Sequence, residues 1–101
     1  MVKPEYTANG AVGGDLHTRV ALIGIVVEKP QAVPQMNEIL HEYAHYVIGR
    51  MGIPYEKRGV SIISVAVDAP ADVISALSGK IGRLEGISTK TIYSKLPEKE
   101  I

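Results

Sequence analysis

The order of apolar patterns along this 101-residue chain predicts an α+β fold, a βαββαβ sandwich in which two helices cover one face of a four-stranded antiparallel sheet. Apolar runs rich in β-branched residues occupy residues 19–28 and 60–67. Apolar residues at helical spacing follow each run after a proline. Because right-handed crossovers place both helices on the same face of the sheet, the pattern predicts the ferredoxin-like arrangement.

Length and composition restrict the classes of protein to which the chain can belong. With 101 residues, 46% of them hydrophobic and 22% charged, the chain should form one globular domain. Eleven basic residues balance eleven acidic ones, so autonomous nucleic-acid binding is disfavoured. There is no cysteine, which excludes disulfides and thiolate chemistry. Without a signal-peptide pattern or an apolar run of about 20 residues, we expect a cytoplasmic protein that makes no membrane contact.

The first half of the chain predicts a tail, a central strand and a helix. Residues 1–18 have no apolar period and should form a flexible N-terminal tail. Residues 19–28 are apolar on both faces, as in the centre of a sheet. Pro30 and Pro34 then introduce a helix. Its apolar positions are Met36, Ile39, Leu40, Tyr43, Ala44 and Val47.

The second half predicts a hairpin, a helix and a last strand. Residues 46–55 form an irregular edge strand that contains Pro54, and a turn at 56–59 joins it to the strand at 60–67. Asp68 is the expected N-cap of the second helix. The buried stripe of that helix is Val73, Ile74, Leu77, Ile81 and Leu84. Residues 87–96 complete a domain that spans 19–96, and residues 97–101 form a charged C-terminal tail.

The strands at 19–28 and 60–67 carry apolar side chains at both odd and even positions, and therefore on both faces of the sheet, although helices are expected on one face only. Monomers rarely leave an apolar face of this size exposed. We therefore expect a homo-oligomer, a dimer or a tetramer, that associates through the open sheet face or along a strand edge.

His41 and His45 are the candidate metal ligands. They lie four residues apart with Glu38 and Glu42 beside them, a spacing that can bind a divalent ion from one helix. A third ligand could come only from His17 or from another subunit. The alternative is a solvated helix surface with ordinary i,i+4 pairs, which is the more frequent situation.

Two other sequence patterns fit a structural role better than a ligand-binding site. Residues 78–82 contain serine, glycine and lysine but lack the spacing of a phosphate-binding loop, so small residues there should allow close packing. Basic residues that could bind an anion are interleaved with Glu56, Glu85 and Asp72; they are Arg50, Lys57, Arg58, Lys80 and Arg83. With no nucleophile elbow and no carboxylate pair in an apolar run, we identify no catalytic residue and expect no enzyme.

Four segments within residues 19–96 give the chain a family resemblance: 23–28, 33–42, 49–54 and, most specifically, 76–87. They resemble a small bacterial family of iron-only hydrogenase system regulators. That family is similar to the ACT domain and to the C-terminal domain of the nickel-responsive repressor, which are ferredoxin-like modules that bind small ligands or metal at subunit interfaces. The resemblance implies transcriptional or other regulation of a hydrogenase system.

Three departures limit what the resemblance implies. The nickel site needs several histidines and a cysteine, which are absent from residues 60–68. The ACT effector site uses a glycine in the first strand-to-helix loop, where this chain has Glu28, Lys29 and Pro30. Residues 1–18 lack the length and the basic character of a ribbon-helix-helix arm for DNA.

Three hypotheses of function follow. The first is a regulatory module that oligomerises, binds a small-molecule effector at a subunit interface and signals to a protein partner. The second is a structural or adaptor protein that acts by protein–protein assembly alone. The third is a protein that binds a divalent metal through His41 and His45.

Overall fold

The computed structural model describes residues 17–96 and 99–100, so the remainder of the two predicted tails lies outside the described residues. The elements in chain order are β1 (His17–Val27), η1 (Pro30–Ala32), α1 (Val33–Glu42), η2 (Ala44–Tyr46), β2 (Val47–Tyr55), η3 (Glu56–Arg58), β3 (Val60–Ala69), α2 (Ala71–Gly82), β4 (Ile87–Tyr93) and β5 (Lys99–Glu100). The 3-10 segments η1, η2 and η3 are single turns at the ends of longer elements.

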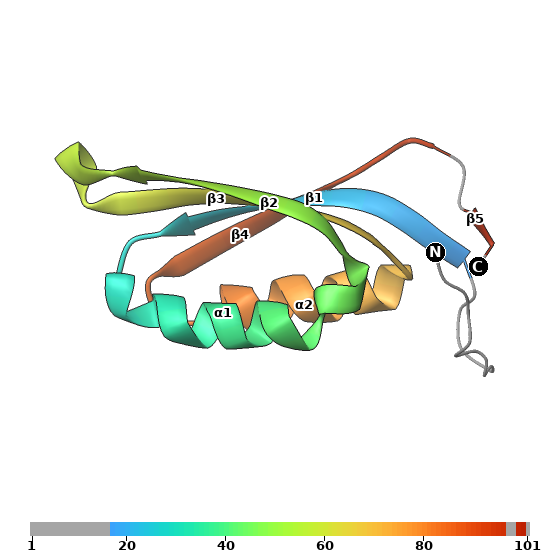
Figure 1. Cartoon of the computed structure of the whole chain (residues 1–101), viewed down its shortest axis with the longest axis horizontal. Helices are drawn as coiled ribbons and strands as arrows, with labels where there is room; N and C mark the ends of the chain where they lie inside the picture. The colour runs from blue at the N-terminus through green and yellow to red at the C-terminus, as the bar shows by residue number, and fades with distance from the viewer. Residues whose placement is uncertain (1–16, 97–98, 101) are drawn as a thin grey trace.

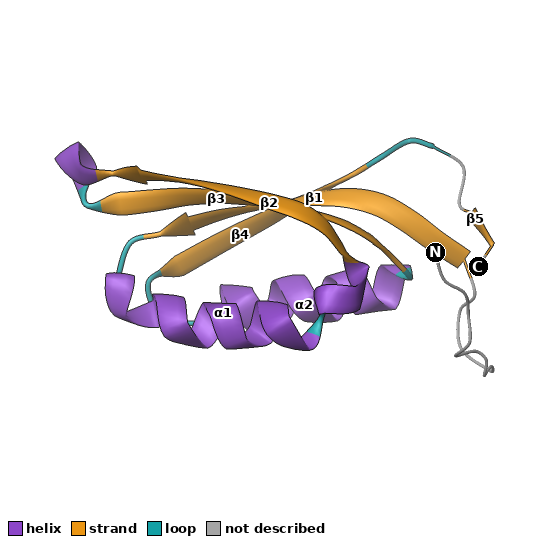
Figure 2. Cartoon of the chain, in the orientation of Figure 1, coloured by secondary structure: helices purple, strands orange, loops and turns teal. Residues whose placement is uncertain are grey.

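The strands form an antiparallel sheet in the order β2-β3-β1-β4, and β5 pairs with the first two residues of β1. Strands β2 and β4 are the edges of this four-stranded path. Both α-helices of the described chain lie beneath the same face of the sheet, and no described element covers the other face (Figures 1 and 2). The predicted fold class and element order are confirmed.

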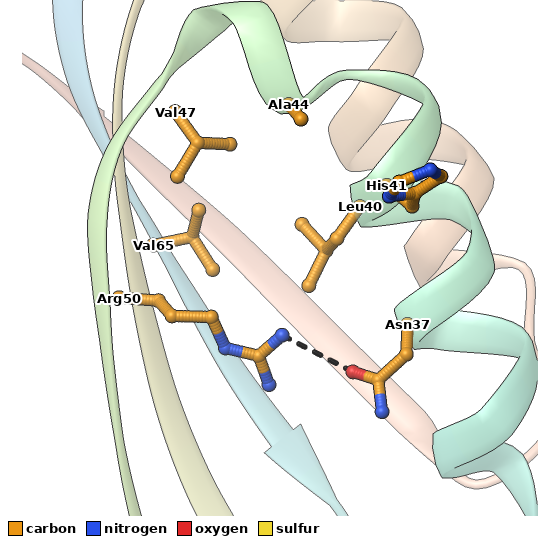
Figure 3. A pocket seen from close by; sticks show the side chains of 7 residues that line it. All are labelled: Asn37, Leu40, His41, Ala44, Val47, Arg50 and Val65. Atoms are coloured by element: carbon orange, nitrogen blue, oxygen red, sulfur yellow. Dashed lines mark hydrogen bonds between the residues drawn. The ribbon is translucent and has the colours of Figure 1, made fainter.

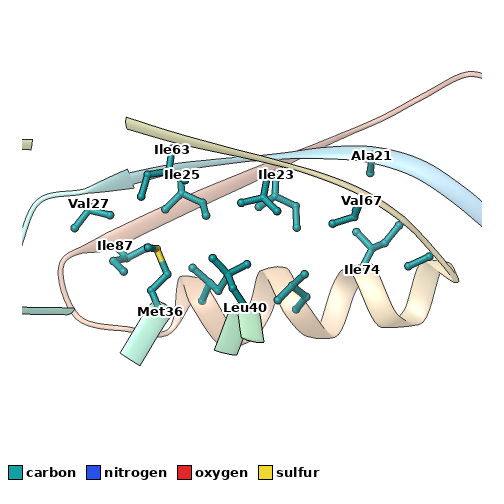
Figure 4. Close-up of a cluster of buried hydrophobic side chains, with 14 of the residues drawn as sticks. Ala21, Ile23, Ile25, Val27, Met36, Leu40, Ile63, Val67, Ile74 and Ile87 are labelled. Carbon is teal, nitrogen blue, oxygen red and sulfur yellow. The ribbon is translucent and has the colours of Figure 1, made fainter. Parts of the chain in front are cut away.

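Successive side chains of β1 and β3 point alternately into the core and toward the uncovered side of the sheet. The odd-numbered apolar residues of both strands are buried against the helices, and Ile23 and Val65 are fully buried. Figure 4 shows Met36 and Leu40 of α1 and Ile74 of α2 in this core. Leu77 and Ile81 of α2 are buried as well. The even-numbered residues of the strands point away from the helices, so one layer of apolar side chains has no cover in the described chain.

Helix α1 ends earlier than its apolar stripe suggests. Glu42 is its last residue, and Tyr43 has φ −106° and ψ 19°, outside the helical region. Ala44 belongs to η2 and is exposed, whereas Val47 begins β2 and packs against the core from there. Apolar residues continue at helical spacing past Glu42, so the sequence pattern predicts a helix that is longer than α1 and includes residues of the following turn and strand.

The predicted capping role of Asp68 is wrong. Asp68 is an exposed residue within β3, where it pairs with Val20, and β3 continues to Ala69 because β1 offers it a partner as far as Arg19. Pro70 occupies the N-cap position of α2 without a side-chain cap. The last strand also ends at Tyr93, three residues before the predicted end.

The β2–β3 hairpin turns through η3 and Gly59, which has φ 67° in the left-handed region that favours glycine. A register shift between Val47 and Gly49 interrupts the ladder near the start of β2. In Figure 1 the tip of this hairpin extends past the end of the helix layer. The prediction of an irregular edge strand followed by a hairpin is confirmed.

Candidate functional site

A groove lies between helix α1 and the edge strand β2 on the helix side of the sheet (Figure 3). Its volume is about 340 Å³. The residues that line it are Asn37, Leu40, His41, Ala44, Val47, Arg50 and Val65. The groove exists because η2 turns the chain from α1 into a strand at the sheet edge, beyond which no described element packs.

The floor and the mouth of the groove differ in chemistry. Leu40 and Val65 are buried side chains that form an apolar floor together with Val47. At the mouth, the Nη1 atom of Arg50 donates a hydrogen bond of 3.1 Å to the Oδ1 atom of Asn37. Arg50 reaches this position because it pairs in register with Val65 and so shares the helix-facing side of the sheet. The groove thus has an apolar base and a cationic, donor-rich rim.

Arg50 makes no ion pair with any carboxylate of the described residues. Asn37 Oδ1 already accepts from Arg50, so the Asn37 amide group offers donors to the groove. Glu38 and Glu42 instead line a neighbouring hollow on the outer side of α1, which shares Asn37 and His41 with the groove. The positive charge of Arg50 is therefore available to an anion.

The two predicted metal ligands belong to different helical segments. His41 lies in the last turn of α1 and lines the groove, whereas His45 lies in η2, beyond the end of that helix. The i,i+4 geometry that the spacing implies therefore does not arise from one continuous helix. Within the described part of the chain, no group of three or more His, Asp or Glu side chains could hold a metal ion.

The open face of the sheet is the second candidate site. Register places its residues in rows across the four strands: Gly49, Ala66, Leu22 and Ile92 in one row, Met51, Ser64, Gly24 and Lys90 in the next, and Ile53, Ile62, Val26 and Ser88 in the third. Met51, Ile53 and Ile92 are exposed to 72%, 66% and 69%. We call these three rows the open face; large apolar side chains extend across it from one edge strand to the other.

Gly24 lies in the middle row of the open face, in the central strand. A Cβ atom added to it would come no closer than 3.7 Å to another atom, the carbonyl oxygen of Lys90, which is an ordinary contact. The fold itself therefore does not require glycine at this position. A glycine inside a strand often marks the close approach of a ligand or another backbone, which here would come from outside the sheet.

The segment at residues 78–82 is structural, as expected. It lies inside α2, where the Ser78 hydroxyl is 3.2 Å from the Thr91 hydroxyl of β4. A Cβ atom on Gly82 would lie 2.9 Å from the Oγ1 atom of Thr89. Its small residues therefore let the helix pack closely on β4, and a neighbouring subunit is not needed to explain them.

The basic residues do not form one patch. Lys57 and Arg58 lie at the hairpin tip, Arg50 lies in the groove, and Lys80 and Arg83 lie on or beside α2. Lys80 is engaged on the surface: its ammonium lies 5.1 Å from the Tyr43 ring centre and 3.7 Å from the Glu42 carboxylate. A hydrogen bond to the Tyr43 side chain, followed by its Coulombic interaction and the effect of Glu42, raises the pKa of Lys80.

The groove was not predicted from the sequence. Asn37 was not among the candidate residues, and Arg50 was one of five basic residues interleaved with carboxylates. The alternation of side chains along β2 was a usable signal for the groove. Val47 and Arg50 lie on either side of the register shift, which brings both side chains to the helix side of the sheet. The depth of the groove has no signature in the sequence, since it depends on how far α1 lies from the sheet edge.

No helix in the described residues is long and apolar enough to span a membrane. Residues 19–91 match the family model described as "TM1266-like: Iron-only hydrogenase system regulator, putative". The chain is also similar to the solved structure of uncharacterized protein TM1266 from Thermotoga maritima, with a TM-score of 0.74 and 34% sequence identity. That similarity covers 77% of this chain and 99% of the other. No curated protein matches the chain.

Proposed function

Because the chain belongs to the TM1266-like family of iron-only hydrogenase system regulators, we propose that it is a regulatory module without catalytic activity that works as a homodimer and responds to a small ligand. The observation that carries the proposal is the open face of the sheet. The balanced charge of the chain favours a protein as the recipient of its signal over nucleic acid.

The size of the open face suits a dimer interface. The β1–β3 ladder runs over nine residue pairs, from Arg19 to Val27. At about 3.3 Å per residue and about 4.8 Å between strands, the whole uncovered side of a four-stranded sheet of that length has a footprint of about 600 Å² before side-chain relief is added, and the three rows of the open face are its central part. A standard interface buries about 800 Å² on each partner. Covering this face with one other protein surface would therefore give an interface of ordinary size.

A second copy of the chain is the partner that fits the face best. A two-fold axis brings the same surface of both copies together, so an apolar face meets an apolar face. Gly24, Ser64 and Ala66 are small and lie near its centre, which allows the two sheets to approach closely. Lys90 lies on the edge strand β4, so its aliphatic stem can lie on the interface while its ammonium reaches solvent.

Sedimentation velocity and native mass spectrometry of the full chain test this proposal. Ile92→Glu should raise the dimer dissociation constant by at least about tenfold, because a two-fold interface then loses two apolar side chains and brings two carboxylates against an apolar face. Ala76→Glu is the matched control, since it adds the same charge at an exposed position of α2 on the opposite side of the molecule. Ile92 is mostly exposed in one protomer, so the fold should tolerate the change.

Three outcomes are informative. A parent protein that remains a monomer at micromolar concentration, or a dimer that Ile92→Glu and Ala76→Glu affect equally, would contradict assembly through the open face. A dimer that retains a small molecule in the native spectrum would support the response to a ligand. A dimer that binds no small molecule in a screen would instead favour an adaptor that acts by assembly alone.

A further inference from the structure

The groove between α1 and β2 combines an apolar floor with an unneutralised guanidinium group, which is the arrangement that holds an amphipathic anion. We propose that it binds a small aliphatic monocarboxylate within one protomer. The role of that ligand as a signal rests on the proposed regulatory function. The binding itself does not, because the groove lies on the helix side of the sheet and the proposed dimer forms on the other side.

The floor sets the size and the apolar character of the ligand. Leu40, Val47 and Val65 present aliphatic surface, and Ala44 leaves room beside them (Figure 3). The volume of about 340 Å³ lies at the lower end of the range for small-molecule sites. A branched chain of about five or six carbon atoms would cover the floor and displace water from it.

The rim sets the charge of the ligand. One Nη1–H of Arg50 is used on Asn37, which leaves most of the guanidinium fork free for a bidentate contact with a carboxylate. The Asn37 amide nitrogen can donate to the same carboxylate. Arg50 and the Asn37 amide nitrogen make the rim rich in donors, so a ligand that only accepts hydrogen bonds suits it better than an amine.

The neighbouring hollow argues for a single negative charge. Glu38 and Glu42 line it on the outer side of α1, and it shares Asn37 and His41 with the groove. A phosphate or a dicarboxylate would bring a second negative charge toward these carboxylates, which costs free energy. A monocarboxylate needs only the one charge of Arg50 for neutralisation.

A titration of the ¹⁵N-labelled full chain with 4-methylpentanoate, followed by NMR, tests the inference. We expect saturable shifts of the backbone amides of residues 37–50, with a dissociation constant in the millimolar range or below. The uncharged isostere 4-methylpentanamide should bind at least about tenfold more weakly, because it cannot form the charge-assisted pair.

Two substitutions test separately the charge of Arg50 and the free volume of the groove. Arg50→Gln should weaken binding of the acid at least about tenfold, while the control Arg83→Gln, beside α2, should leave it unchanged. Ala44→Leu should abolish binding by filling the groove without removing any charge. The spectra themselves report whether each variant is folded.

The inference is overturned if the acid does not saturate by about 20 mM, a weak limit for a ligand of this size. It is also overturned if the acid and the amide bind alike, or if Arg50→Gln has no more effect than Arg83→Gln. Repeating the titration on Ile92→Glu distinguishes the two proposals: binding that persists in a monomer supports the groove, and binding lost with the dimer contradicts a site within one protomer.

Discussion

A Cβ atom on Gly82, the last residue of α2, would lie 2.9 Å from the Oγ1 atom of Thr89 in β4. The Thr89 hydroxyl is held in place, because it donates to the Ser78 carbonyl oxygen at 3.4 Å. Thr89 is also β-branched and stiff at its first torsion angle. The distance between α2 and β4 is therefore set by the absence of a side chain at residue 82.

Gly82→Ala and Gly79→Ala should change stability in opposite directions. At the end of the helix the alanine gains at most about 1 kcal/mol of helix propensity, but overpacking against Thr89 costs about 1–3 kcal/mol, so Gly82→Ala should lower the free energy of unfolding by about 1 kcal/mol. Around Gly79, the nearest atom is the guanidinium tip of Arg83 at 3.6 Å, which can move. Gly79→Ala should raise stability by about 0.5–1 kcal/mol. Urea denaturation of both variants checks this, and a stabilised Gly82→Ala would contradict the packing argument.

The two glycines with positive φ should differ in their sensitivity to alanine. Gly59 has φ 67° and open space around it, so Gly59→Ala should cost only the left-handed penalty of about 1–2 kcal/mol. At Gly86, with φ 85°, an added Cβ would lie 2.6 Å from the Cβ of Lys29. Gly86→Ala should therefore cost at least about 2 kcal/mol and more than Gly59→Ala. Thermal unfolding of the pair measures the order, and equal costs would refute it.

Gly24→Val tests the open face without adding charge. The protomer should keep or slightly increase its stability, because valine suits a strand better than glycine and the added Cβ atom meets only the Lys90 carbonyl oxygen, at 3.7 Å. The dimer should weaken, since the valine side chain would hold the facing sheet away from the centre of the interface. Unfolding of the isolated protomer at low concentration and sedimentation at high concentration separate the two effects. A dimer of unchanged affinity would show that Gly24 is not a point of close approach.

The contact of Lys80 with Tyr43 should appear in a pH titration. Its raised pKa, caused mainly by the hydrogen bond to Tyr43, favours the protonated amine in the folded chain. This contribution to stability is present below the ordinary lysine pKa of about 10.4 and is lost as pH rises through the higher folded pKa. Tyr43→Phe should return the pKa of Lys80 toward its ordinary value, measured by NMR of the side chain. A value that Tyr43→Phe leaves unchanged would assign the shift to Glu42.

Periodicity was sufficient to predict the order of elements and most of the core. Met36, Ile74 and Leu77 lie at the predicted apolar positions of the two helices and are buried, because helical spacing records which side of a helix faces the core. Element ends were less predictable. Asp68 has the chemistry of a helix cap, but pairing with β1 extends β3 through it, and a sequence pattern does not contain that long-range pairing.

The two candidate sites also differ in how well the sequence predicts them. The open face was predictable, since apolar residues on both parities of β1 and β3 cannot all face the helices. The contact between Arg50 and Asn37 was not, because it joins two elements across the edge of the sheet, and the register shift in β2 decides which of its residues face α1. His41 and His45 were predicted together as metal ligands, whereas the structure places His41 at the groove and His45 in the following 3-10 turn.

The position of β1 in the sheet also affects how the chain is made. β1 is the first strand in the sequence, yet its two neighbours are β3 and β4, so that Ala21 pairs with both Val67 and Tyr93. A nascent chain emerging from the ribosome therefore carries an apolar strand that is unpaired until β3 is available and half-paired until residues 87–93 are available. Such non-local pairing slows folding, and unpaired strand edges favour aggregation. We expect that translation stalled before β4 would leave a chain that binds chaperones.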